Sequence, residues 1–124
     1  MTPEELKKRT MGYALRCVKL ADSLPKGPTG STIARQLVRS STSTAANYRA
    51  ACLARSKAEF ISKLGIVEEE ADETVFWIEF AIEAGLTRKK LVSELVAEGR
   101  EITAIIVSSR KTAKARQRRQ KGSK

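Results

Sequence analysis

The stretch that most constrains the fold is residues 36–84, QLVRSSTSTAANYRAACLARSKAEFISKLGIVEEEADETVFWIEFAIEA. Its apolar residues recur at steps of three and four, the spacing that places side chains on one face of an α-helix. The pattern is interrupted near Ser56, where Ser56 and Glu59 form the Ser-x-x-Glu signature of a helix N-terminus. The stretch therefore predicts two consecutive amphipathic helices. The first is rich in small residues, and the second carries apolar residues on two faces.

Two further helices are predicted on either side of this pair. Thr2, Pro3 and Glu5 indicate a capped helix start, and the segment PKGPTG interrupts the pattern after Leu24. We expect the second helix to be capped by Thr29 or Ser31. The predicted helices span residues 3–24, about 31–53, about 57–84, and from about residue 88 to beyond residue 109.

One stripe on each predicted helix is expected to face a common core. The first stripe is Leu6, Thr10, Tyr13, Ala14, Cys17, Ala21 and Leu24, and the second is Ile33, Leu37, Ser40, Thr44, Tyr48 and Ala51. The third is Phe60, Leu64, Val67, Ala71, Thr74, Val75, Ile78 and Ile82, and the fourth is Leu91, Leu95, Ile102, Ile105 and Ile106. On the fourth helix, Val92, Val96, Gly99 and Val107 widen the apolar surface.

Four helices, short connections and the lack of a strand pattern predict an all-α fold, an antiparallel up-down-up-down four-helix bundle. The bundle is expected to occupy residues 1–109. Residues 110–124 form a basic C-terminal tail that either continues helix four or is disordered.

The residue types argue against catalysis. The chain has no histidine, which is the commonest general base and metal ligand. Cys17 and Cys52 are far apart in sequence and fall at apolar helix positions, so we expect reduced core thiols rather than a disulfide or a zinc site. We therefore predict a protein that is not an enzyme and uses no cofactor, metal or small-molecule substrate.

The apolar runs are too short to span a bilayer, and MTPEELKKRT lacks the apolar segment of a secretory signal. A cytoplasmic location without membrane association is the resulting expectation.

Charge is distributed in blocks along this basic chain, whose formal net charge is +10. Residues 1–58 sum to +8, residues 59–109 to −6, and residues 110–124 to +8 with no acidic residue. The tail residues are Arg110, Lys111, Lys114, Arg116, Arg118, Arg119, Lys121 and Lys124. Such a segment is typical of binding to nucleic acid phosphates, and its lack of aromatic residues predicts sequence-tolerant binding. The alternative is a solubilising terminus without a dedicated partner.

Three arginines of the second helix, Arg35, Arg39 and Arg49, fall on the side opposite its core stripe. They are candidates for binding phosphates along a nucleic acid backbone. Two alternatives remain open: a solvated face, or pairing with the acidic residues 68–73 of a neighbouring subunit.

The third helix is predicted to have a second apolar face, formed by Ile66, Phe76, Trp77 and Phe80. A surface helix of a monomer needs only one apolar face, so these residues predict an oligomer interface.

The same stretch resembles a known family, the four-helix-bundle proteins first described as encoded in intervening sequences of 23S rRNA genes. This superfamily includes the accessory variability determinants of diversity-generating retroelements. The matching residues are Gln36, Leu37, Arg39, Ser40, Ser43–Arg49 with Ala50, Arg55, Ser56, Glu59, Phe60, Lys63, Leu64, Gly65, Glu69–Thr74 and Trp77, with the Leu24-Pro25 helix end. The shorter family pattern often continues Ala-Asn-Ile-Ala-Glu-Gly, whereas this chain continues Asn47-Tyr48-Arg49-Ala50, as in a separate branch.

The resemblance implies a closed ring, commonly a homopentamer, without catalytic activity. Similarity to the retroelement members further implies binding of RNA and of a reverse transcriptase. From residues and resemblance together, we predict a non-catalytic homo-oligomer that binds nucleic acid, RNA in particular, through its basic surface and tail. The alternative is a structural or protein-interaction scaffold without dedicated nucleic acid binding.

Overall fold

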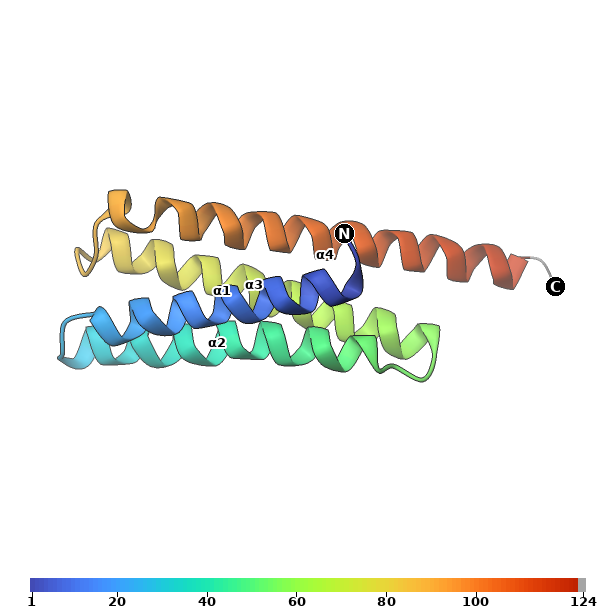
Figure 1. The fold of residues 1–124 in the computed structure, drawn as a ribbon, viewed down its shortest axis with the longest axis horizontal. Helices are drawn as coiled ribbons and strands as arrows, with labels where there is room; N and C mark the ends of the chain where they lie inside the picture. Colours follow the sequence, from blue (N-terminus) through green and yellow to red (C-terminus); the bar gives the residue numbers. More distant parts are fainter. Residues whose placement is uncertain (123–124) are drawn as a thin grey trace.

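The computed structural model describes residues 1–122. It contains four helices: α1 (Pro3–Ser23), α2 (Pro28–Cys52), α3 (Lys57–Glu83) and α4 (Lys89–Gly122). The helices run antiparallel in an up-down-up-down order (Figure 1). No strand occurs within the described residues. The predicted all-α four-helix bundle is confirmed.

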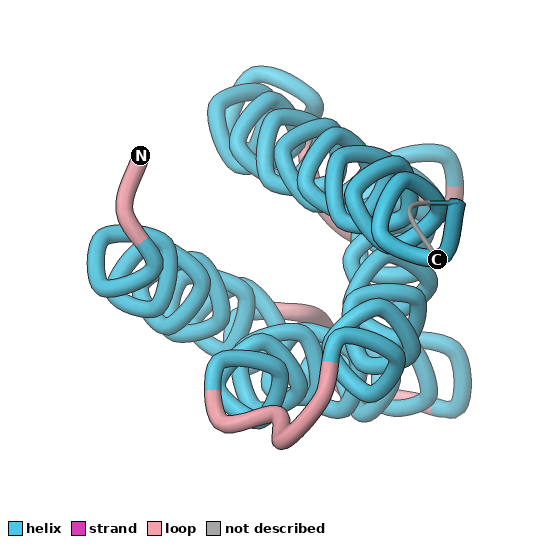
Figure 2. The backbone as a smooth tube through the Cα atoms, turned by 90° about the vertical axis from the view of Figure 1, so that its right-hand side faces the viewer, coloured by secondary structure: helices cyan, strands magenta, loops and turns pink. Residues whose placement is uncertain are grey.

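The helices pack in chain order around the bundle. α1 packs on α2, α2 on α3, and α3 on α4, whereas α1 and α4 approach each other over a much smaller area. The end-on view shows this arrangement, with α1 and α4 as the separated first and last members (Figure 2). α1 is therefore covered well by α2 on one side and only slightly by α4 on the other.

Local sequence explains where α1 and α3 begin. The Thr2 hydroxyl accepts a hydrogen bond from the Glu5 backbone N–H at 3.1 Å, and the Ser56 hydroxyl accepts one from the Glu59 N–H at 3.1 Å. These bonds satisfy N–H groups that have no partner within the helix. Both predicted caps are confirmed.

The predicted cap of α2 is wrong. α2 begins at Pro28 and is preceded by Gly27, so neither Thr29 nor Ser31 caps it. Proline suits the first helical position because its ring fixes φ and it has no N–H to satisfy. Gly27 turns the chain at φ +139°, a conformation that favours glycine. Gly30 lies directly against the Pro25 carbonyl, where a side chain would collide.

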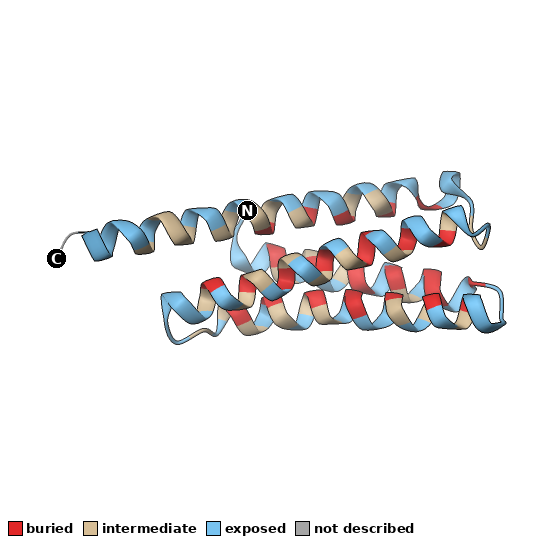
Figure 3. Cartoon of the chain, turned by 180° about the vertical axis from the view of Figure 1, so that it is seen from behind, coloured by how far each residue is buried: buried red, intermediate tan, exposed pale blue. Residues whose placement is uncertain are grey.

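The core lies between the four helices, and buried positions recur along their inward faces (Figure 3). Its largest fully buried apolar side chains are Tyr13, Ile33, Leu37, Leu64, Ile78, Ile102 and Ile106. Small polar residues of α2 are buried where it meets α3. There the Thr74 hydroxyl donates to the Ser40 hydroxyl at 2.9 Å, and Thr44 donates to the Ser40 carbonyl at 2.8 Å. The predicted small-residue face of α2 thus packs closely against its neighbour.

The core stripe of α4 differs from the prediction. Leu91, predicted to be in the core, is 75% exposed, and Val92 is buried in its place. The buried positions are Val92, Leu95, Gly99, Ile102 and Ile106, so the stripe begins one residue later. Leu91 lies in the first turn, where α4 leaves its connection to α3. Ile105 is half-buried, and on α3 Ile61 and Ala81 join the core while Phe60 and Ile82 lie at its edge.

Candidate nucleic acid interface

The basic tail continues α4 as a helix. α4 extends past the connection between α2 and α3, so its last turns project beyond the bundle (Figure 1). We call residues 110–122 the α4 extension. It contains seven basic residues and no acidic residue. Lys124, predicted as part of the tail, lies outside the described residues.

Arg110 is held by the bundle rather than presented to solvent. Its Nε donates to the Ile61 carbonyl at 3.3 Å, and its Nη1 lies 3.8 Å from the Glu68 carboxylate. The guanidinium also lies 3.0 Å from the position that a Cβ on Gly65 would occupy. Arg110 therefore anchors the base of the extension on α3.

The remaining basic residues surround much of the extension. At 100° per residue, Lys111, Lys114, Arg118 and Lys121 fall within about 80° of one another. Arg116 and Arg119 lie on other sides of the helix. All of these except Lys114, which is half-buried, are exposed. Like charges on a single rigid rod create a local field that attracts polyanions.

The three arginines of α2 do not form one open cluster. Arg39 is paired with two carboxylates of α3, at 2.9 Å from Glu70 and in direct contact with Glu73. These carboxylates raise the pKa of Arg39. Arg39 therefore pairs with the acidic residues of α3 within one chain, rather than with those of a neighbouring subunit. Since helix packing sets this contact, the sequence pattern did not reveal it.

Arg35 and Arg49 are exposed. Arg35 makes a long 3.5 Å hydrogen bond to the Thr32 hydroxyl, and Arg49 lies beside Lys7 between α1 and α2. These two arginines remain candidates to supplement the α4 extension.

Arg9 joins α1 to α4, a role that the sequence pattern did not indicate. Its Nε and Nη2 donate to the two Glu98 carboxylate oxygens at 2.8 and 2.7 Å, and Nη2 lies 2.9 Å from Glu101. This bidentate ion pair joins α1 to α4. It raises the pKa of Arg9 and lowers the pKa of Glu98. A basic residue outside the apolar stripe gave no signal of such a partner.

The thiols and acids within residues 1–122 form neither a disulfide nor a three-residue metal-binding group. Cys17 and Cys52 are both free, Cys17 buried and Cys52 half-buried. Burial raises the pKa of Cys17 to about 12. In this described part of the chain, acids and thiols do not gather into a group of three able to hold a metal ion. Nor do residues 1–122 contain a helix with the length and apolar character needed to cross a membrane.

The residues predicted for an oligomer interface occupy two environments. Ile66, Phe76 and Phe80 are 38%, 51% and 44% exposed. Trp77 is half-buried against the core, and its Nε1 is buried without a hydrogen-bond partner among the described residues. The rings of Phe76 and Trp77 pack edge to face, with centroids 5.0 Å apart, and Phe80 completes the cluster. Phe76 and Phe80 therefore form the solvent-facing part of this cluster, supported from below by Trp77.

Both the sequence and the fold of this chain are similar to those of known proteins. Residues 4–108 match the family model of the 23S rRNA-intervening sequence proteins. A crystal structure of a protein of unknown function from the S23 ribosomal protein family of Bacteroides thetaiotaomicron is similar at 32% identity and a TM-score of 0.82. The alignment covers 90% of this chain and 99% of that chain. No match was found among curated proteins. The family match ends before the α4 extension begins. Because it covers most of the chain, this protein belongs to the 23S rRNA-intervening sequence protein family.

Proposed function

We propose that this protein is a non-catalytic homo-oligomer that binds nucleic acid through the α4 extension. The observation that carries the proposal is the continuous helix that projects past the bundle with seven basic residues and no acidic one. The resemblance described above supports a pentamer, RNA as the nucleic acid, and a reverse transcriptase as the protein partner.

The mechanism is electrostatic and multivalent. Each lysine or arginine that neutralises a phosphate releases condensed counterions, so affinity falls steeply as salt rises. One short helix binds weakly. Several copies held in one assembly act on the same polyanion at high effective concentration, which multiplies the affinity without new contacts. The extension has no aromatic side chain on which bases could stack, so binding tolerates different sequences.

A scaffold without nucleic acid binding is the second candidate. It is favoured by the engagement of Arg39 and Arg110 within the chain, which removes two predicted phosphate ligands from the open surface. In that case the α4 extension serves only to keep the protein soluble.

A mobility-shift titration separates the two candidates. RNA and DNA of equal length are titrated at about 50 and 200 mM salt with the full chain and with a chain ending at Ser109. Binding that weakens steeply with salt and is lost on truncation supports the proposal. If the full chain fails to bind either polymer below roughly tens of micromolar at the lower salt, the scaffold function stands instead.

A further inference from the structure

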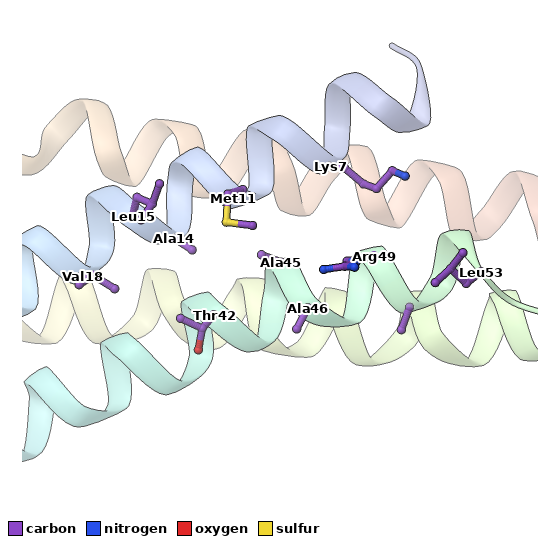
Figure 4. A pocket seen from close by; sticks show the side chains of 11 residues that line it. Lys7, Met11, Ala14, Leu15, Val18, Thr42, Ala45, Ala46, Arg49 and Leu53 are labelled. Atoms are coloured by element: carbon purple, nitrogen blue, oxygen red, sulfur yellow. The ribbon is translucent and has the colours of Figure 1, made fainter.

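An apolar groove runs along the surface between α1 and α2. It encloses about 540 Å³ and is lined by four alanines together with Met11, Leu15, Val18 and Leu53 (Figure 4). Met11, Leu15 and Leu53 are 53%, 59% and 73% exposed. Exposed large apolar side chains around a hollow are typical of a surface that another protein segment covers.

The residues that line the groove have the periodicity of a helix-binding site. On α1, Lys7, Met11, Ala14 and Val18 follow one another at steps of four, three and four. Thr42, Ala46 and Arg49 of α2 and its C-cap residue Leu53 follow at the same steps. This alternation is the seam spacing of coiled coils, where side chains of one helix insert between those of another. Each helix thus presents a second seam in addition to the one that faces its own core.

α3 carries a matching protrusion on its outer surface. Glu69, Glu73, Phe76, Phe80 and Glu83 also follow at steps of four and three, and we call them the α3 ridge. Phe76 and Phe80 project from it, since about half of each side chain is exposed. The eleven steps from Glu69 to Phe80 rise about 16 Å along α3, the same rise as from Lys7 to Val18 along α1.

Charge is complementary between the two surfaces. Arg49 lies in the groove beside Lys7, which pairs with Glu4 one turn away. The ridge, in contrast, holds three glutamates, and Asp72 and Glu79 lie on the same side of α3. Glu73 already pairs with Arg39 and Glu79 with Arg100, so Glu69, Glu83 and Asp72 carry the negative charge offered to a neighbouring copy. Ridge-to-ridge contact would bring these carboxylates together, whereas ridge-to-groove contact pairs opposite charges.

We propose that the α3 ridge of one copy docks into the α1–α2 groove of the next copy. This inference rests on the proposed assembly and identifies the two surfaces that form it. Phe76 and Phe80 enter the alanine-lined groove, and the ridge glutamates lie along its basic margin. Because the two surfaces differ, the contact is head-to-tail, and it closes into a ring when the rotation between copies divides a full turn.

The test uses two variants that each destroy one surface. Ala46→Glu fills the groove and gives it negative charge, and Phe76→Glu with Phe80→Glu removes both ridge anchors. Each variant alone is expected to sediment as a 13.7 kDa monomer with unchanged helix content. An equimolar mixture retains one intact ridge and one intact groove, so it is expected to form a 1:1 dimer and nothing larger.

Ala104→Glu and Leu91→Glu serve as matched controls, because both residues are exposed on α4 outside the two surfaces. Both controls should keep the mass of the unmodified chain. The inference is overturned if Ala46→Glu keeps that mass, or if the mixture of the two variants stays monomeric. An unmodified chain that is itself monomeric contradicts the proposed assembly as a whole, so the two failures are distinguishable.

Discussion

The phenol of Tyr13 on α1 lies against the backbone of Gly99 on α4, so closely that a Cβ at position 99 would overlap the phenol oxygen and Val75. Tyr13 and Gly99 are both buried. One turn of α1 earlier, Arg9 binds Glu98. The limited contact between the first and last helices therefore includes a close approach at a residue without a side chain and, beside it, the ion pairs of Arg9 with Glu98 and Glu101.

Gly99→Ala is expected to lower the free energy of unfolding by about 1–3 kcal/mol, because Tyr13 and Val75 must shift to admit the methyl group. This loss outweighs the roughly 1 kcal/mol that alanine gains over glycine within a helix. Gly12→Ala is the control, since nothing lies within 4 Å of its Cβ position. Urea denaturation should show that Gly12→Ala is more stable than the unmodified chain. Equal effects of the two substitutions would contradict the assigned Tyr13 contact.

The Arg9–Glu98 pair should make stability depend on pH in the acid range. Arg9 lowers the folded-state pKa of Glu98 below its ordinary value of 4.5. The stabilisation is therefore fully present above pH 4.5 and is lost as the pH falls through the lower folded-state pKa. Glu98→Gln should cost about 1–2 kcal/mol at neutral pH and flatten the acid limb of a stability–pH curve. The exposed Arg100–Glu79 pair provides the comparison: Glu79→Gln should cost less than about 1 kcal/mol at neutral pH.

Substitutions of two adjacent basic residues of α4 should have different effects, one on stability and the other on nucleic acid binding. Arg110→Ala is expected to lower stability by about 1 kcal/mol, because the guanidinium bonds to Ile61 and Glu68, while nucleic acid affinity changes little. Lys111→Ala is expected to leave stability unchanged and to reduce the slope of log affinity against log salt by about one. Thermal unfolding and mobility-shift titrations of both variants measure these effects. A larger loss of affinity for Arg110→Ala than for Lys111→Ala would reverse the assignment.

The two cysteines should differ in reactivity. Cys17 is buried and its pKa is raised to about 12, so neither access nor thiolate formation favours reaction at neutral pH. Cys52 is half-buried near the end of α2. A thiol reagent is expected to modify Cys52 in the folded protein and Cys17 only at the rate of unfolding. Cys52→Ser is the control, and fast labelling of that variant would show that Cys17 is accessible.

Helix caps, which depend on neighbouring residues in the sequence, were predictable, whereas contacts between side chains of different helices were not. The Thr2 and Ser56 caps depend on residues three positions apart, so the pattern alone located them. The core stripe of α4 was shifted by one residue at Leu91, because Leu91 and Val92 have similar hydropathy and only packing on α3 decides which is buried. Arg39 and Arg110 were grouped with the open basic residues because their acidic partners come from α3, more than 30 residues away in sequence.

For Phe76 and Phe80, periodicity predicted the face of the helix but not the degree of burial. Periodicity correctly placed apolar residues on the outer face of α3, but it did not distinguish them from Trp77, which partly enters the core. The distinction affects experiments, since Trp77→Glu is expected to disturb folding as well as surface contacts. Phe80 is the better position at which to test the surface alone.

Single copies of this chain are not expected to be its working form. The decisive experiment is sedimentation of the unmodified full chain over a range of concentrations. We expect a discrete species whose mass is a whole-number multiple of 13.7 kDa and that persists on dilution. A mass of 13.7 kDa at every concentration would contradict it, because the exposed phenylalanines and the α1–α2 groove would then have no second copy to cover them.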